Sequence, residues 1–378
     1  MIYVDHAATT KISETAKLAM LSAMEKDWYN PSSLYTQGQQ ASGTLMDARV
    51  RIARCLGCLP KEIYFTSGGS EADNQAILSA AAIGKRQGKM HIISTAFEHH
   101  AVLHTLKKLK KEGFEITLLD VGEKGIVSPA QVEKAIRPDT ALVTVMYANN
   151  EIGTIQPIRE IGAVCRQNGV LFHTDAVQAA GHLPINVKED QIDMLSLSAH
   201  KFNGPKGIGV LYAKIGVFLT NLIEGGGQER GKRAGTENLP AITGMAAALE
   251  EACALQKERS IYVTKLRDQL IDGLKKIPGA LLNGDEIRRL PGNVNFCFPD
   301  TEAEGLLLLL DNKGICASSG SACTSGFLDP SHVLLAIGRD PQTARGSLRL
   351  TLDYENTPEE VETIIEAVTD TVRILRGC

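Results

Sequence analysis

The stretch EIYFTSGGSEADNQAILSAAAIGKRQGKMHIISTA, residues 62–96, decides the fold class of this chain. It begins with a short run of β-branched and aromatic residues, passes through a glycine-rich turn, and places apolar residues at helical spacing over residues 70–88. A second β-branched run follows at residues 90–96. A strand, a helix and a second strand in this order predict a β-α-β unit with parallel strands.

The same alternation continues along the chain as far as Lys214. Helical spacing returns at residues 158–169, and five more runs are expected to form strands: residues 115–120, 141–149, 170–176, 194–200 and 207–214. Strands covered on both faces by intervening helices are typical of a parallel sheet. We therefore expect an α/β domain built on a mostly parallel seven-stranded sheet.

The pattern changes after a glycine-rich segment at residues 224–240. A long helix is expected from about Pro240, followed by a strand, a helix, two strands and a helix at residues 292–299, 304–312, 314–321, 346–352 and 357–377. Because 378 residues exceed what one core usually holds, two domains are expected. We assign residues 15–255 to a large α/β domain, and residues 1–14 and 256–378 to a smaller α+β domain.

The composition is that of an ordinary globular protein, with 43% hydrophobic and 22% charged residues. The net charge of −4 is spread along the chain, so a basic surface for nucleic acid is not indicated. The amino terminus MIYVDHAATT lacks the layout of a secretion signal, and no apolar run is long enough to span a bilayer. We expect a cytoplasmic protein that binds neither nucleic acid nor membranes.

The eight cysteines are too sparse for a disulfide framework, and a reducing cytosol keeps most such residues as thiols. Cys55 and Cys58 form a C-x-x-C motif, but a zinc site would need a second such pair, and the other cysteines are scattered singly. A lone pair at a helix end more often packs than binds a metal. A non-enzymatic thiol or metal-binding module built on this pair stays open as an alternative.

Polar residues that directly follow the expected strands are candidates for a binding site, because ligands bind beyond the carboxyl ends of parallel strands. After the first strand, the turn SGGSEADN at residues 67–74 begins a helix. The free backbone N–H groups of Gly69 and Ser70 there could hold a phosphate. The alternative is an ordinary glycine turn in which Ser70 caps the helix.

Asn150, Asp175 and Gln178 follow two further strands. A carboxylate at such a position could hold a ring nitrogen, and an amide could donate to a phenolic oxygen. Asn and Asp also favour turns for local reasons, so each of these residues has an ordinary alternative role.

Lys201 stands where the strand MLSLS gives way to a Gly-Pro turn. A lysine at the rim of a sheet is suited to form an imine, although a solvated surface lysine is the simpler alternative. Ser198 and His200 lie two residues apart on a segment expected to be extended, so they would share a face and could donate to one phosphate.

The stretch EHHAVLH, residues 98–104, carries three histidines. His99 follows a strand, where an imidazole could lie over a bound ring and move protons. His100 and His104 are one helical turn apart, which raises a zinc alternative. The order differs from H-E-x-x-H and no third ligand can be named, so no metal site is assigned.

Eleven pieces of this sequence, in the same order, are similar to one family. They are DHAATT, YNPSS, FTSGGSEADN, EHHAV, NNEIG, HTDAVQ, SAHKFNGPKGIG, GGGQERGKRAGTEN, LNGD, SSGSACTS and SLRLTL. The chain resembles the cysteine desulfurases, which are class V aminotransferase-like enzymes of fold type I that use pyridoxal 5'-phosphate. The resemblance runs nearly end to end and implies that the large domain binds this cofactor.

The resemblance also implies a role for each residue at the sheet edge. Lys201 would hold the cofactor as an imine and later move the substrate Cα proton, and Asp175 would pair with the pyridine nitrogen. Gln178 and Asn150 would reach the phenolic oxygen, and His99 would stack on the ring. The residues expected to hold the phosphate are Gly69, Ser70, Ser198 and His200.

Two more residues gain roles from the family pattern. Thr236 would reach the phosphate in a neighbouring subunit, which implies a homodimer. Arg349 would clamp the carboxylate of the substrate, a bidentate task that suits its planar fork.

Cys323 stands in SSGSACTSG, residues 318–326, among small residues that offer no apolar core. By resemblance it is the nucleophile that takes sulfur from L-cysteine, leaving L-alanine and an enzyme persulfide. The loop is similar to that of the branch that supplies iron-sulfur cluster assembly, so a sulfur-acceptor protein such as a cluster scaffold is an expected partner. A selenocysteine lyase and another class V aminotransferase remain alternatives.

Overall fold

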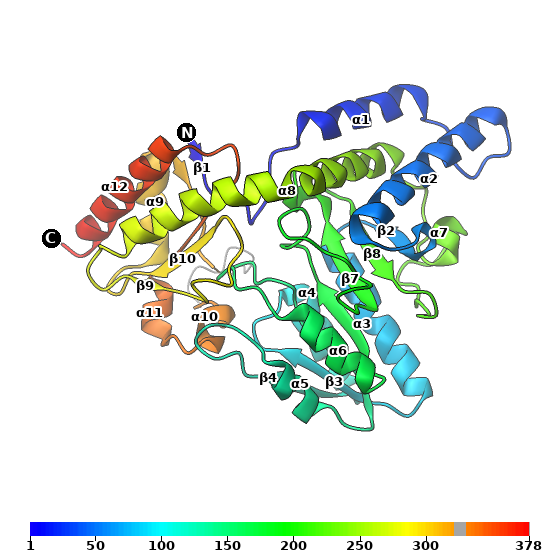
Figure 1. The fold of residues 1–378 in the computed structure, drawn as a ribbon, viewed down its shortest axis with the longest axis horizontal. Coiled ribbons are helices and arrows are strands. Elements are labelled where there is room, and N and C mark those ends of the chain that lie inside the picture. Colours follow the sequence, from blue (N-terminus) through cyan, green and yellow to red (C-terminus); the bar gives the residue numbers. More distant parts are fainter. Residues whose placement is uncertain (321–329, 378) are drawn as a thin grey trace.

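The structure is a computed structural model that describes residues 1–320 and 330–377. Its largest sheet has seven strands in the order β2-β8-β7-β6-β5-β3-β4 (Figure 1). These strands are β2 (Ile63–Thr66), β3 (His91–Thr95), β4 (Glu115–Leu119), β5 (Thr140–Thr144), β6 (Leu171–Asp175), β7 (Met194–Ser198) and β8 (Gly209–Ala213). Five neighbouring strands, from β7 to β4, run parallel, whereas β8 is antiparallel to both β7 and β2. The predicted mostly parallel seven-stranded sheet is confirmed.

Both faces of this sheet are buried, as the continuous apolar strands require. On β3, Ile93 joins a core cluster with Val143 and Phe172, whereas its neighbour Ile92 joins a second cluster with Leu142. Side chains on a strand alternate between faces, so the two clusters lie on opposite sides of the sheet. The helices flanking it are α3 (Gly69–Arg86), α4 (His100–Lys111), α5 (Pro129–Ala135) and α6 (Ile158–Gln167).

Two local expectations at the strand ends are wrong. Ser70 does not cap α3, because the helix begins at Gly69 and Gly68 is its N-cap, with φ of 155°. A residue with a side chain rarely adopts this backbone conformation. His200 does not continue an extended segment, because β7 ends at Ser198 and residues Ala199–Lys201 form a 3-10 turn.

A smaller sheet, ordered β12-β10-β9, forms the second structural region. Its strands are β9 (Leu281–Leu282), β10 (Asn293–Cys297) and β12 (Ser347–Thr351), and they pair antiparallel. The helices α9 (Ala303–Asn312) and α12 (Pro358–Leu375) pack with it. Strand β1 (Ile2–Tyr3) pairs in parallel with β11 (Ile315–Cys316), so the start of the chain joins this region (Figure 1).

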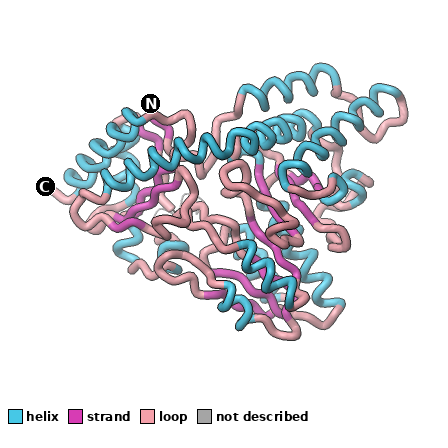
Figure 2. The backbone as a smooth tube through the Cα atoms, in the orientation of Figure 1, coloured by secondary structure: helices cyan, strands magenta, loops and turns pink. Residues whose placement is uncertain are grey.

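Helix α8 (Leu239–Leu274) runs from one region to the other (Figure 2). Met245 and Leu249 near its start belong to the core of the large sheet, whereas Leu270 and Leu274 near its end belong to the core of the small sheet. The predicted long helix is therefore present. The predicted domain boundary at residue 255 lies within this helix.

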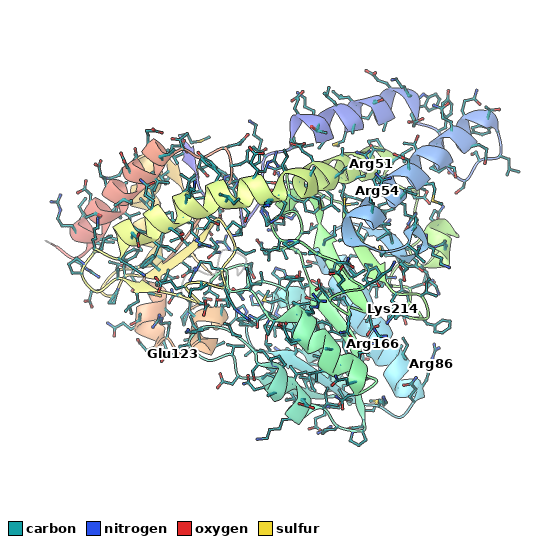
Figure 3. All side chains as sticks on the ribbon, in the orientation of Figure 1. Arg51, Arg54, Arg86, Glu123, Arg166 and Lys214 are labelled. Carbon is teal, nitrogen blue, oxygen red and sulfur yellow. The ribbon has the colours of Figure 1, made fainter. Side chains whose placement is uncertain are left out.

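The remaining described elements surround these regions. They are α1 (Glu14–Lys26), α2 (Thr36–Leu56), α7 (Gln228–Gly231), α10 (His332–Ala336), α11 (Pro341–Arg345) and a 3-10 turn at Pro60–Glu62. Both α1 and α2 pack against α8. Charged side chains are spread over the surface, among them Arg86, Arg166 and Lys214 (Figure 3). Among the described residues, no helix is both long enough and apolar enough to cross a membrane.

Candidate active site at the carboxyl ends of the strands

A pocket of about 320 Å³ opens at the carboxyl ends of β5, β6 and β7. Ten of the twelve predicted site residues line it: Gly69, Ser70, His99, Asn150, Asp175, Gln178, Ser198, His200, Lys201 and Arg349. They come from several separate parts of the chain. The parallel sheet brings most of them together because its strands end at one edge.

Lys201 projects its ammonium group into this pocket from the 3-10 turn after β7. Its Nζ donates to the carbonyl oxygens of Ala7 and Ala8 at 2.6 and 2.7 Å. Gln178 Nε2 also donates to the Ala7 carbonyl, at 2.9 Å. The amino-terminal segment is therefore held against the pocket by two of the predicted site residues.

Asp175, the last residue of β6, is buried at the floor of the pocket. Burial raises its pKa to about 6, although the N–H of Val177 donates to Oδ1 at 2.9 Å and the charge of Lys201 acts in the opposite direction. A cationic or N–H partner stabilises the charged form of such a buried carboxylate. Its position suits a ring nitrogen.

The two imidazoles at the pocket are held in the neutral form. Burial, followed by the charge of Lys201, lowers the pKa of His99 and the pKa of His200 to about 4. His99 is also the N-cap of α4, and its Nδ1 accepts from the N–H of Ala101 at 3.2 Å. The proton of the neutral ring therefore sits on Nε2.

The start of α3 forms a cradle suited to an anion. A Cβ placed on Gly69 would lie 2.6 Å from Val177 Cγ2, so a side chain at this position would displace the pocket wall. Gly69 lines the pocket as the first residue of an 18-residue helix, and the first N–H groups of a helix are available to bind an anion. Ser198 lines the same part of the pocket.

Arg349 reaches the pocket from β12 and is buried. Its Nη2 donates to Asp5 Oδ1 at 2.9 Å, and its Nη1 donates to the carbonyl oxygen of Asn150 at 3.1 Å. Its Nε has no hydrogen-bond partner among the described residues. These two bonds use two of the five N–H donors of the guanidinium, so Arg349 keeps donors for a further acceptor.

Three buried acids near the pocket were not predicted. Asp73 lines the pocket, and burial followed by the Asp175 charge raises its pKa; its Oδ1 lies 3.7 Å from His173 Nε2. Burial raises the pKa of Glu98 to about 8 and that of Glu151 to about 7. All three lie in motifs whose other residues were predicted to form the site. Nothing in the local sequence indicates that these acids are buried.

The described lining of this pocket does not include Thr236. Thr236 lies on an exposed loop before α8. Cys323 lies outside the described residues. The chain before it is anchored beside the pocket, because Ser318 and Arg349 exchange backbone hydrogen bonds of 3.2 and 2.7 Å.

The alternative metal ligands have other contacts. The ring of His100 stacks on that of His104 with centroids 5.1 Å apart, and it lies 4.6 Å from the ring of His332. Within residues 1–320 and 330–377, no three His, Cys, Asp or Glu side chains are grouped as a metal site.

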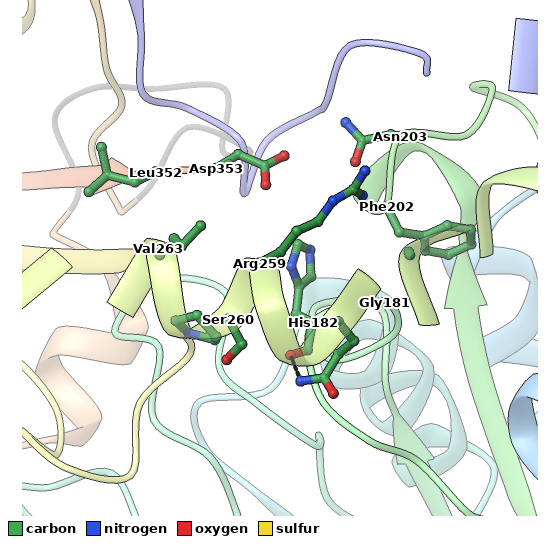
Figure 4. A pocket seen from close by; sticks show the side chains of 13 residues that line it. Gly181, His182, Phe202, Asn203, Arg259, Ser260, Val263, Leu352 and Asp353 are labelled. Atoms are coloured by element: carbon green, nitrogen blue, oxygen red, sulfur yellow. Dashed lines mark hydrogen bonds between the residues drawn. The ribbon is translucent and has the colours of Figure 1, made fainter. Parts of the chain in front are cut away.

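A smaller cavity of about 30 Å³ lies between α8 and the residues that follow β12, and Phe202, the neighbour of Lys201, also lines it (Figure 4). His182 Nε2 lies 3.0 Å from the carbonyl oxygen of Lys201, and Gln256 Nε2 donates to the His182 carbonyl oxygen at 3.0 Å. This cavity has room for a water molecule rather than a substrate. Its walls support the turn that carries Lys201.

The geometry of the larger pocket fits pyridoxal phosphate. The α3 cradle suits the phosphate, buried Asp175 suits the ring nitrogen, and Lys201 stands at the pocket wall where an imine can form. The fold and the site together define an enzyme of the pyridoxal phosphate class. The model of the family described as aminotransferase class-V matches residues 2–364, so the chain belongs to that family. Enzymes of this family depend on pyridoxal phosphate.

The relatives of the chain share one printed activity. It is 51% identical over 376 residues to "Cysteine desulfurase IscS" of Methanosarcina thermophila, covering 100% of this chain and 93% of the relative. It is 46% identical to "Putative cysteine desulfurase IscS 1" of Bacillus subtilis, covering 99% of both. A solved structure titled "NIFS-LIKE PROTEIN" matches with a TM-score of 0.92 at 36% identity, covering 99% of each chain. The structure "SspA in complex with cysteine" matches with a TM-score of 0.83 at 36% identity, covering 94% of this chain and 100% of that one.

Proposed function

We propose that this protein is a cysteine desulfurase. It breaks the C–S bond of L-cysteine, forms an S–S bond at the Cys323 thiol, and releases L-alanine, so that Cys323 carries the sulfur as a persulfide. The observation that carries the proposal is the meeting of Lys201, Asp175 and the start of α3 in one pocket. The names of its relatives agree with this activity.

When bound, pyridoxal phosphate withdraws electrons from the substrate Cα and so labilises the bonds around it. Asp175 would hold the ring nitrogen, and Gln178 with Asn150 would hold the phenolic oxygen. The phosphate would lie on Gly69, Ser70, Ser198 and His200. These roles use donors and acceptors that already line the pocket.

The protein's own groups then orient the substrate and move its protons. Lys201 Nζ takes and returns a proton, and the Ala7 and Ala8 carbonyl oxygens fix its position. Neutral His99 lines the pocket and carries its proton on Nε2. Arg349 receives the substrate carboxylate with N–H donors that its bonds to Asp5 and to the Asn150 carbonyl do not use.

Cys323 attacks the substrate sulfur. The described residues on both sides of its segment support this role: Ser318 pairs with Arg349, and Ser331 donates to Glu151. Arg349 lines the pocket, and Glu151 directly follows the pocket residue Asn150. The chain is therefore anchored beside the site both before and after the segment that carries Cys323.

The test is a single turnover with L-cysteine, followed by peptide mass spectrometry. We expect one added sulfur on Cys323 and one L-alanine per site. The Cys323→Ser variant should keep the yellow colour of the cofactor and its response to L-cysteine, but should release no sulfide. 3-Mercaptopyruvate in place of alanine would indicate an aminotransferase, and turnover of selenocysteine alone would indicate a selenocysteine lyase; either result overturns the proposal.

We also infer a cytoplasmic homodimer that passes sulfur to an acceptor protein, such as an iron-sulfur cluster scaffold. Exposed Thr236 is available to complete the phosphate site of a second copy. The apolar side chains of Trp28, Leu34 and Tyr35 are also exposed, which favours a covered surface near α1 and α2. Light scattering of the wild type and cofactor retention in Thr236→Ala test this; a monomer with full cofactor content would contradict it.

A further inference from the structure

Cys55 and Cys253 line the same cavity, although they lie far apart in the sequence. Cys55 lies in the last turn of α2 and is half-buried, whereas Cys253 lies on α8 and is exposed. Both residues line one cavity, and the main influence on the pKa of each thiol is the other thiol. The partner of Cys55 is thus a residue of another helix, and not Cys58 of its own C-x-x-C motif.

An ion pair one helical turn away fixes this contact. Arg51 Nη2 donates to Glu250 Oε2 at 2.7 Å (Arg51 is labelled in Figure 3). Cys55 follows Arg51 by four residues, and Cys253 follows Glu250 by three, so each thiol lies on the same helix face as the charge before it. The packing of α2 on α8 therefore holds both sulfur atoms in register.

The two thiols line a cavity of about 220 Å³ with walls formed by Leu56, Leu183 and Leu249 among others. None of its lining residues belongs to the pocket of Lys201. A small disulfide in solution can reach exposed Cys253 without entering the active site.

We propose that Cys55 and Cys253 form a reversible disulfide that ties α2 to α8, by exchange with a low-molecular-weight disulfide such as oxidised glutathione. In the first step the Cys253 thiolate attacks one sulfur of the reagent, and one small thiol leaves. In the second step Cys55 loses its proton, attacks the Cys253 sulfur, and displaces the second small thiol. The protein loses two hydrogens, and the reagent is reduced to two thiols.

The charge distribution gives the order of these steps. Cys253 is exposed, and the neighbouring Cys55 lowers its pKa, whereas the pKa of half-buried Cys55 is raised beside Cys253. The thiolate is the attacking form, so Cys253 reacts first. Burial raises the pKa of Cys58 to about 12, which keeps this nearby thiol protonated. Cys58 is therefore the matched control.

The experiment equilibrates the cofactor-bound Cys323→Ser protein with mixtures of oxidised and reduced glutathione, so that sulfur on Cys323 does not interfere. Peptides are then mapped without reduction. We expect one cross-linked pair containing Cys55 and Cys253, lighter by two hydrogens and cleaved by dithiothreitol. Since the bond closes a long loop, oxidation should also raise Tm by roughly 2–6 °C.

Added single variants identify the pair. With Cys58→Ser the cross-link and the Tm rise should persist, whereas with Cys253→Ser both should vanish and Cys55 should stay a thiol. With Cys55→Ser, glutathione should remain on Cys253. A Cys55–Cys58 cross-link, a stable glutathione adduct on Cys253 of the parent protein, or two free thiols in oxidised glutathione alone would each overturn the proposal.

Discussion

Arg349 Nη2 donates to Asp5 Oδ1 at 2.9 Å, which joins the centre of β12 to the first residues of the chain. The Arg349 side chain is 4% exposed and that of Asp5 is 19% exposed. The Ala7 and Ala8 carbonyls that accept from Lys201 follow shortly after Asp5. This ion pair therefore positions both the substrate arginine and the segment that holds the lysine.

Replacing Arg349 by Lys should weaken substrate binding. Lysine keeps the charge, but its single ammonium cannot serve Asp5, the Asn150 carbonyl and a carboxylate in one plane. We expect KM for L-cysteine to rise about tenfold or more, with a smaller change in kcat. Steady-state kinetics measure this, and the cofactor absorbance serves as control. An unchanged KM would remove Arg349 from the substrate site.

Asp5→Asn should lower stability. The change leaves the buried Arg349 charge without its carboxylate, at a cost of about 1–3 kcal/mol in the free energy of unfolding. The cost is below that of a fully buried pair because Asp5 is partly solvated. Urea unfolding monitored by circular dichroism measures it. Equal stability of variant and wild type would show that solvent replaces the pair.

Gly69→Ala should weaken retention of pyridoxal phosphate. The new Cβ would lie 2.6 Å from Val177 Cγ2, so the cradle at the start of α3 must open. We expect the cofactor Kd to rise about tenfold or more. Equilibrium dialysis with absorbance detection measures the loss. Gly69→Ala combined with Val177→Ala should recover much of the affinity, and failure to recover would place the defect elsewhere.

Gly43→Ala is the matched glycine control, and it should stabilise the fold without weakening cofactor binding. Gly43 lies inside α2, and an added Cβ there meets no atom within 4 Å. Alanine should therefore raise the free energy of unfolding by about 0.5–1 kcal/mol, because it restricts the unfolded chain and favours the helix. Denaturant melts of the two variants test the contrast. A destabilised Gly43→Ala would contradict the described packing of α2.

Glu98→Gln should flatten the pH dependence of stability of the cofactor-free protein. Burial raises the pKa of Glu98 from 4.5 to about 8, so the folded state binds this proton more tightly than the unfolded state. The stabilisation that protonated Glu98 gives the folded state is complete below pH 4.5 and is lost as pH rises through about 8. The wild type should therefore lose about 2–4 kcal/mol more than the variant between about pH 5 and pH 8.

Urea melts across this pH range measure the difference between the two proteins. The glutamine amide oxygen in the variant can still accept from Thr95 Oγ1 and the Met146 N–H, which donate to Glu98 Oε1 at 2.7 and 3.0 Å. The comparison thus isolates ionisation from the loss of hydrogen bonds. Parallel curves for the two proteins would mean that Glu98 ionises normally.

The sequence by itself predicted the sheet and nine residues that line the pocket, and the family resemblance added Arg349. Seven apolar runs, several of them separated by helices, are best buried as a sheet covered on both faces. Asp175, Lys201 and Ser70 each stand at or just beyond a strand end. Because parallel strands end at one edge, chain order alone places such residues together. Glycine-containing turns and helical spacing are local signals, so they need no knowledge of distant contacts.

The tertiary structure decided the pairings that cross the fold. Asp5 meets Arg349, and Cys55 meets Cys253 and not its near neighbour Cys58. It also decided that Glu98 and Asp73 are buried acids, and that Gly68 rather than Ser70 caps α3. These pairings, buried acids and caps cannot be predicted from local residue patterns. They arise only when packing fixes which helix faces and strand ends meet, and packing also sets the burial that shifts a pKa.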